Sequence, residues 1–103
     1  MDFDSYYYDR KGQPMSQEDW LSKFDDLAYK RVAQDTLLDG RWVSTVWVGM
    51  NHQMGAGPPL IFETMVFPSN DNMNDEYCER YSTEEQAVVG HAEVLERLSK
   101  EMA

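Results

Sequence analysis

The chain has 103 residues, with 19 acidic and nine basic side chains and a formal net charge of −10. This length leaves room for one domain with a modest core, and three Trp and six Tyr indicate a chain that folds rather than a disordered one. So large an excess of acids argues against direct binding of nucleic acid, because phosphates repel carboxylates.

The sequence shows no sign of a membrane or secretory segment. No run approaches the roughly 20 apolar residues that span a bilayer. The start, MDFDSYYYD, is acidic where a signal peptide is basic and then apolar. The single cysteine, Cys78, cannot form an internal disulfide, which fits a reducing compartment. We therefore expect a cytoplasmic protein that does not enter membranes.

The N-terminal third predicts a short strand, a turn and a helix. Residues 6–8, all Tyr, are a strand candidate, and the following DRKGQP has the Asp, Gly and Pro of a turn. Ser16 and Asp19 form a variant capping box at the start of a helix. Apolar residues then recur at helical spacing, which we interpret as core packing: Trp20, Leu21, Phe24, Leu27 and Ala28.

The central third predicts three antiparallel strands. The pair Asp39-Gly40 favours a type I′ turn between a strand near residues 31–37 and the next at 42–50. WVSTVWVGM and LIFETMVF are rich in β-branched and aromatic residues, and a loop with two of the six glycines and two adjacent prolines separates them. The sheet should therefore be a meander with residues 42–50 in the middle and residues 6–8 as a candidate fourth strand.

The expected register sets Trp47 opposite Glu63 and Thr45 opposite Met65. Gln34, Thr45 and Glu63 would then form a polar centre on one face, within an apolar surround. Glu63 should be exposed or paired there, because a buried unpaired carboxylate is costly; the alternative is a ligand site.

The same face should also drive self-association. Four large apolar residues gather on it, and the two helices cannot cover it as well: Trp47, Ile61, Met65 and Phe67. Large apolar patches seldom stay exposed on monomers, so we expect a homodimer.

Two connections carry further candidate residues. The loop 51–59 combines His52 with flexible glycines, a composition that can wrap a small ligand or an anion, although it has no phosphate-binding fingerprint. Residues 68–80 form an acidic connection that contains Asp71, Asp75, Glu76 and Glu79. This segment lacks the mid-loop Gly and the closing Glu of a calcium loop, so we assign no metal and no cofactor.

The last helix should open with the capping box at residues 82–85 and run to about residue 101. Its apolar stripe places His91 toward the sheet. We interpret His91 as a satisfied core residue. The alternative is a site in which His91 meets a carboxylate such as Glu63.

Together these elements predict one α+β domain over residues 1–103. The expected order is strand, helix, strand, strand, strand, helix, with both helices packed on one face of an antiparallel sheet of three to four strands.

Several motifs together resemble a known family. YYYDRKGQPMSQEDW, STVWVG, PPLIFETMVF and YSTEEQAVVGH are similar to segments of a family of small uncharacterised proteins of tailed bacteriophages and prophages. The resemblance spans nearly the whole chain. It implies a phage accessory protein that acts in the host cytoplasm, and it implies no catalytic residue.

Three functional hypotheses follow. The first is a non-enzymatic binding module that docks on the basic surface of a host nucleic-acid-handling or defence complex and inhibits it. Its binding acids would be Asp71, Asp75, Glu76 and Glu79 in the connection and Glu93 and Glu96 on the last helix.

The second hypothesis is a protein that binds or sequesters a small ligand such as a nucleotide, with Trp47 and Tyr81 as stacking residues. The third is a small enzyme, which needs His91, His52 and Glu63 to converge in one cleft.

Overall fold

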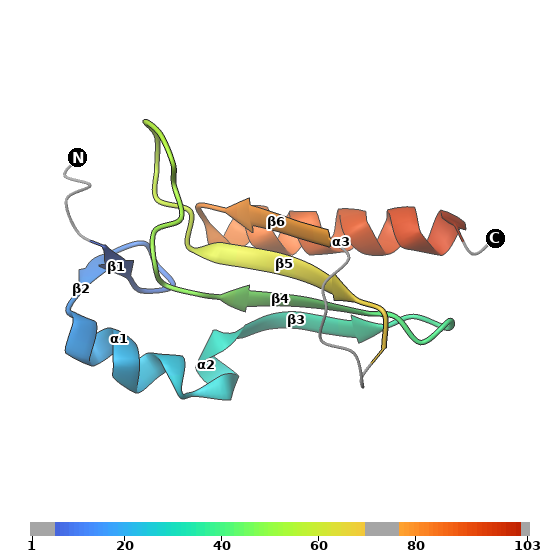
Figure 1. Ribbon diagram of the computed structural model, residues 1–103, viewed down its shortest axis with the longest axis horizontal. Coiled ribbons are helices and arrows are strands. Elements are labelled where there is room, and N and C mark those ends of the chain that lie inside the picture. The colour runs from blue at the N-terminus through green and yellow to red at the C-terminus, as the bar shows by residue number, and fades with distance from the viewer. Residues whose placement is uncertain (1–5, 70–76, 102–103) are drawn as a thin grey trace.

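The computed structural model describes residues 6–69 and 77–101 (Figure 1). These residues form a two-stranded sheet, a four-stranded antiparallel sheet and three helices, so the predicted α+β class is confirmed. The elements in chain order are β1 (Tyr7–Tyr8), β2 (Pro14–Met15), α1 (Gln17–Phe24), α2 (Leu27–Lys30), β3 (Arg31–Thr36), β4 (Trp42–Trp47), β5 (Phe62–Phe67), β6 (Tyr77–Tyr81) and α3 (Glu84–Glu101).

The four-stranded sheet is a meander in the order β3-β4-β5-β6. The two predicted hairpins around β4 are confirmed, but the fourth strand is β6, which lies in the segment expected to be an irregular connection. Its sequence, YCERY, carries two charged residues, which discourage pairing of this exposed sheet edge with another chain. The same charges interrupt the alternation of apolar and polar residues that would have indicated a strand. The candidate strand at residues 6–8 pairs with β2 instead, and touches the rest through a bridge between Tyr7 and Met50.

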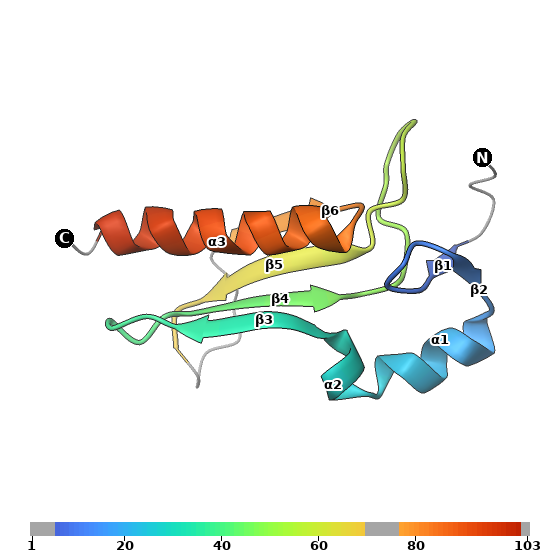
Figure 2. The same ribbon diagram turned by 180° about the vertical axis from the view of Figure 1, so that it is seen from behind.

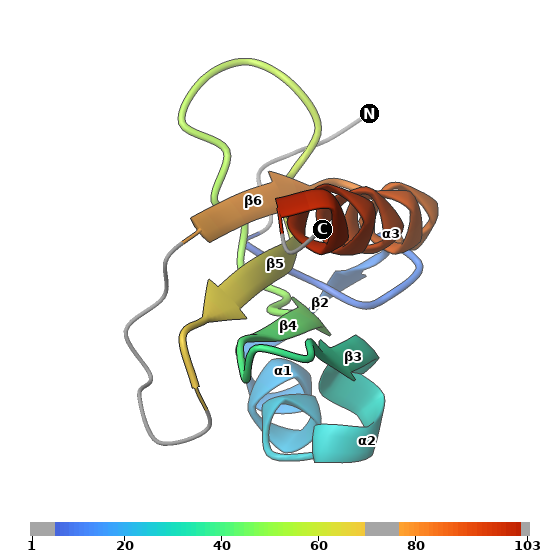
Figure 3. The ribbon, with the colours of Figure 1, turned by 90° about the vertical axis from the view of Figure 1, so that its right-hand side faces the viewer.

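The helices differ from the expectation that two of them cover one face. Of the described helices, only α3 lies along the sheet, whereas α1 and α2 lie at the β3 edge on the side away from α3 (Figures 2 and 3). The expected N-terminal helix is divided because the Asp26 carboxylate accepts a hydrogen bond from the Tyr29 N–H at 3.2 Å and caps a new helix. None of the described helices is long and apolar enough to cross a membrane.

Both helix starts use side-chain caps. Ser16 Oγ accepts from the Asp19 N–H at 3.1 Å, as predicted. At α3 the cap is one residue later than expected, because Thr83 Oγ1 accepts from the Gln86 N–H at 3.1 Å while the Gln86 side chain accepts from the Thr83 N–H.

The turn between β3 and β4 is longer than the predicted type I′ turn. Leu37 N–H donates to the Arg41 carbonyl at 2.7 Å, and Gly40 N–H donates to the Leu37 carbonyl at 3.0 Å, which leaves three residues in the loop. Gly40 has a φ of 94°, whereas no described residue other than glycine has a positive φ. A type I′ turn needs two such residues, so the chain uses a three-residue loop with glycine at its end.

The register of β4 with β5 differs by one residue from the prediction. Thr45 pairs with Thr64, and Val46 pairs with Glu63. Because successive side chains alternate faces, this shift moves every β5 side chain to the opposite face from the one predicted. The face toward α3, called the α3 face below, carries Val43, Thr45, Trp47, Phe62, Thr64 and Val66; the outer face carries Trp42, Ser44, Val46, Glu63, Met65 and Phe67.

Two apolar clusters fill the space beside the α3 face. One lies near the start of α3 and joins the N-terminal elements to the sheet: Tyr8, Trp20, Trp47, Ile61, Phe62 and Ala87. The other lies near the end of α3: Leu37, Val43, Val66, Val94 and Leu98. The predicted apolar stripe of α3 is therefore confirmed for its described members, and His91 lies on it between the two clusters.

Two indole rings hold the first cluster together. Trp47 Nε1 donates to the Tyr8 carbonyl and Trp20 Nε1 donates to the Val48 carbonyl, each at 2.9 Å. Gly49 lies against both rings with a φ of 73°, and a Cβ atom there would collide with Trp47 Cζ2 and with the Trp20 ring. Only glycine fits this position, because the backbone there has a left-handed conformation and the two rings leave no space for a side chain.

We predict that Gly49→Ala lowers the free energy of unfolding by about 3 kcal/mol, since backbone strain and a core collision add. Gly40→Ala is the matched control, because Gly40 has a φ of 94° but nothing within 4 Å of an added Cβ. It should cost about 1 kcal/mol. Urea unfolding followed by Trp fluorescence measures both, and equal losses would contradict the role assigned to the Trp contacts.

Candidate functional site

A chain of buried hydrogen bonds crosses the sheet beneath α3. Thr64 Oγ1 lies 2.5 Å from Thr45 Oγ1, Thr45 Oγ1 lies 2.7 Å from His91 Nδ1, and His91 Nε2 lies 2.8 Å from Asp35 Oδ2. Both threonines are fully buried and His91 is 4% exposed, whereas the Asp35 side chain is half exposed. No buried side-chain N or O atom of the described residues lacks a hydrogen-bond partner.

The direction of these bonds follows from the carboxylate. Asp35 accepts, so His91 Nε2 donates, and with neutral His91 the Nδ1 atom accepts from the Thr45 hydroxyl. Thr45 then accepts from Thr64. The Thr64 hydroxyl also lies beside that of Tyr81, and burial raises the pKa of Tyr81.

An aspartate, a histidine and a hydroxyl in contact are the groups of a nucleophilic triad, but this arrangement cannot work as one. A nucleophile must reach its substrate, and Thr45 and Thr64 have no exposed surface. These hydrogen bonds instead link α3 to β3, β4 and β5. Because each polar group has a partner, the groups can be buried between the two apolar clusters at low cost.

His91 is thus the satisfied core histidine that the sequence predicts, and the alternative contact with Glu63 is wrong. Glu63 lies on the outer face, where its carboxylate meets Arg80 Nε at 3.3 Å and Cys78 Sγ at 3.6 Å. The predicted polar centre of Gln34, Thr45 and Glu63 does not form, because the register places Thr45 on the α3 face. Gln34 Nε2 lies instead 3.4 Å from Ser44 Oγ.

Asp35 was not among the predicted site residues, although its position contains a signal. Asp35 pairs with Val43 and Ala33 pairs with Thr45. Because paired residues point to the same face of a sheet, Asp35 lies on the α3 face together with Val43 and Thr45. The facing threonines and the histidine on the helix stripe could have indicated a buried polar row. Only the register, which the sequence left open, brings them together.

Trp47 is fully buried and is a core residue rather than a binding residue. Its indole also meets the Tyr29 ring edge to face at a centroid distance of 5.0 Å. It cannot stack against an external ligand, so the predicted stacking role for Trp47 is wrong.

His52 lies in the long loop between β4 and β5, and its Nδ1 lies 2.9 Å from the Met50 carbonyl. The loop is braced from within: Asn51 Oδ1 accepts from the N–H groups of Gln53 and Leu60, and Gln53 Oε1 accepts from the Gly55 N–H. Because these donors are used internally, few remain to bind an anion. No group of three or more His, Cys, Asp or Glu in the described part of the chain could hold a metal ion.

The predicted acidic residues fall in two places. Asp71, Asp75 and Glu76 lie outside the described residues. Glu79 is exposed on β6 and lines the same hollow between β6 and α3 as Glu93. In this hollow Arg97 stacks over the Tyr77 ring at 4.7 Å, while burial and then the Glu79 charge raise the pKa of the Tyr77 hydroxyl.

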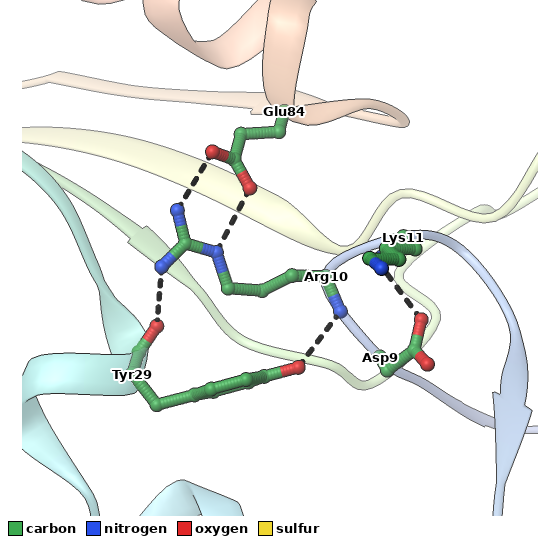
Figure 4. Close-up of polar contacts among 5 residues, drawn as sticks. All are labelled: Asp9, Arg10, Lys11, Tyr29 and Glu84. Carbon is green, nitrogen blue, oxygen red and sulfur yellow. Dashed lines mark hydrogen bonds and ion pairs between the residues drawn. The ribbon is translucent and has the colours of Figure 1, made fainter.

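A cavity of about 480 Å³ lies beside the start of α3, where three segments meet. Arg10 holds these segments together (Figure 4): its Nε and Nη2 atoms bind the Glu84 carboxylate at 2.8 and 2.7 Å, and its Nη1 donates to the Tyr29 carbonyl at 2.8 Å. The Arg10 backbone N–H also donates to the Tyr29 hydroxyl. No local pattern in the sequence indicates this cavity, since its walls are far apart along the chain.

Comparison of the chain with protein-family models, with curated proteins and with solved structures found no match. Its function is therefore inferred from its own surfaces and cavities.

We predict that Thr45→Val lowers the free energy of unfolding by about 3 kcal/mol, because it leaves the Thr64 hydroxyl and the His91 ring without a buried partner. Thr36→Val on the exposed edge of β3 makes the same chemical change at the surface and should cost within about 0.5 kcal/mol. Chemical denaturation measures both. Similar values for the two variants would show that the buried chain adds no stability.

Proposed function

We propose that the protein is a non-enzymatic binding module that docks on a basic surface of a host protein, such as a nucleic-acid-handling or defence complex. In this proposal it is a phage accessory protein that acts in the host cytoplasm. The observation that carries it is the outward surface of α3 and the adjoining β6, called the acidic face below: Glu79, Val88, Val89, Ala92, Glu93 and Glu96.

The acidic face combines apolar contact area with charge. Helical spacing puts the α3 members on the side opposite to buried Ala87, His91, Val94 and Leu98. Val88 and Val89 are 51% and 57% exposed, which is unusual for adjacent valines on a helix that has already buried one side. An apolar centre with charged neighbours is the usual composition of a protein-binding surface.

The acids of this face have little local compensation. Glu96 Oε1 lies 3.1 Å from Lys100 Nζ, but both side chains are more than two-thirds exposed, so the pair is weak. Arg97 is occupied by its contact with Tyr77. The face therefore keeps its negative potential and would steer a partner with a basic surface.

The two other hypotheses have less support. A nucleotide binder loses its stacking Trp47 to the core, and the loop that would hold phosphate uses its donors internally. An enzyme that uses His91, His52 and Glu63 needs them in one cleft, yet His91 and Glu63 lie on opposite faces of the sheet.

We predict that replacing Glu79, Glu93 and Glu96 together by Gln slows association with a partner captured from infected-host lysate by roughly tenfold at low salt. The matched control removes the same number of negative charges from α1 and its C-cap residue, with Glu18→Gln, Asp19→Asn and Asp25→Asn. It should associate at nearly the wild-type rate. Surface plasmon resonance against the purified partner at several salt concentrations measures the rates.

Three results would contradict the proposal. The two triple variants could associate with the partner at the same rate, the wild-type association rate could stay constant as salt rises, or the partner's surface could lack an excess of basic residues. Circular dichroism checks that both variants keep the wild-type fold, which is expected because all six side chains are exposed.

We also propose a homodimer, on grounds that differ from the sequence prediction. Trp47 and Ile61 are buried, but Met65 and Val46 line a groove of about 360 Å³ between α2 and the outer face. The charged residues of this groove are Lys30 and Arg31, which the acids of a second copy would complement. We expect a dimer in sedimentation velocity at tens of micromolar and a monomer for Met65→Lys; a wild-type monomer would contradict this.

A further inference from the structure

The cavity beside Arg10 has no role in the partner binding that we propose for the acidic face. Its floor is apolar and buried, from Tyr8, Pro59 and Ile61. Its walls are the turn at residues 9–13, the prolines of the long loop, and the start of α3. A volume of about 480 Å³ is within the range of small-molecule sites.

The walls of this cavity are held rigidly. In the turn, Asp9 Oδ1 accepts from the Lys11 N–H at 2.9 Å (Figure 4). It also accepts from the Gln13 N–H at 2.9 Å, and the Asp9 N–H donates to the Gln13 carbonyl at 2.9 Å. Arg10 fixes the turn to α3 and α2. The opposite wall has the adjacent Pro58 and Pro59, which limit backbone freedom. A site formed in advance binds its ligand with little loss of entropy.

The charges of the cavity form a dipole. Arg10 and Glu84 neutralise one another in a two-bond pair. Lys11, on the turn, and Glu85, on the first turn of α3, also line the cavity, and both are exposed. Within residues 6–69 and 77–101, neither side chain has a partner in a hydrogen bond or an ion pair. The cavity thus presents one cation and one anion above an apolar floor.

We propose that this cavity binds a small zwitterion, an α-amino acid or short peptide with an apolar side chain. Lys11 pairs with its carboxylate, Glu85 pairs with its ammonium group, and its side chain lies on Ile61 and the prolines. A nucleotide fits poorly, because Glu84 and Glu85 repel phosphate and Arg10 is already engaged. The proposal is independent of the acidic face, since none of these residues belongs to it.

Three matched ligands test the proposal: phenylalanine, N-acetylphenylalanine without the ammonium charge, and phenylalaninamide without the carboxylate. Titration of the ¹⁵N-labelled protein followed by NMR reports binding at the amides of Gly12, Ile61 and Ser82, which surround the cavity. A ligand of about a dozen non-hydrogen atoms should bind with a Kd of about 1 mM. Each derivative should bind about fivefold more weakly than phenylalanine.

Two variants separate an ionic role from a structural one. Lys11→Met should abolish the preference for phenylalanine over its amide and keep the preference over the acetyl derivative. Glu85→Gln should do the converse. Lys100→Met, at the far end of α3, is the control and should keep both preferences. Wild-type dispersion of the remaining NMR signals shows that each variant is folded.

The proposal is overturned if phenylalanine at a concentration on the order of ten times that Kd moves none of these amides. Equal binding of the three ligands would overturn it too, because the cavity would then recognise only apolar surface. So would a loss of binding in Lys11→Met that is the same for all three ligands.

Discussion

The hydrogen bond between the Thr45 and Thr64 hydroxyls fixes the register on which the rest of the molecule depends. These residues face each other at the middle of β4 and β5, which otherwise present only apolar side chains to α3, and both are fully buried. A slip of one residue would turn Glu63 and Met65 toward α3 and leave a buried carboxylate, a large cost. The register therefore determines which side of the sheet can accept the helix.

His91 extends this constraint from the sheet to α3. The two ring nitrogens of His91 contact Thr45 and Asp35, so only one position of the helix along the sheet allows both hydrogen bonds. The apolar clusters on either side supply most of the burial, but apolar contacts alone tolerate sliding. A buried polar row adds the positional requirement that such contacts lack.

The N-terminal elements attach to the sheet through the end of β4. Trp47 and Trp20 donate to backbone carbonyls across this junction, and Gly49 lets the two rings approach the chain. Arg10 then joins the turn after β1 to α2 and α3. These contacts create the cavity with Lys11 and Glu85 on its walls, at the start of α3 and one turn before Val88 and Val89 of the acidic face. The molecule thus separates three surfaces by charge: the acidic face, the dipolar cavity, and a groove with Lys30 and Arg31.

Local chemistry in the sequence determined much of the secondary structure. The cap at Ser16, the strands β3, β4 and β5, the hairpin at Asp39-Gly40 and the inward stripe of α3 with His91 all follow from propensity and spacing, because each depends on residues close together in the chain. The β6 strand and the split at Asp26 were missed, since charged edge residues and a second cap are weak signals.

Only the tertiary structure decided the register, and with it the partner of His91 and the environments of Trp47 and Glu63. The long loop between β4 and β5 allows more than one pairing, and a shift of one residue reverses a whole strand. The cavity beside Arg10 was equally beyond local reasoning, because its walls come from positions near residues 10, 58 and 84. The sequence states which residues are charged or apolar, but contacts across such separations depend on how the whole chain packs.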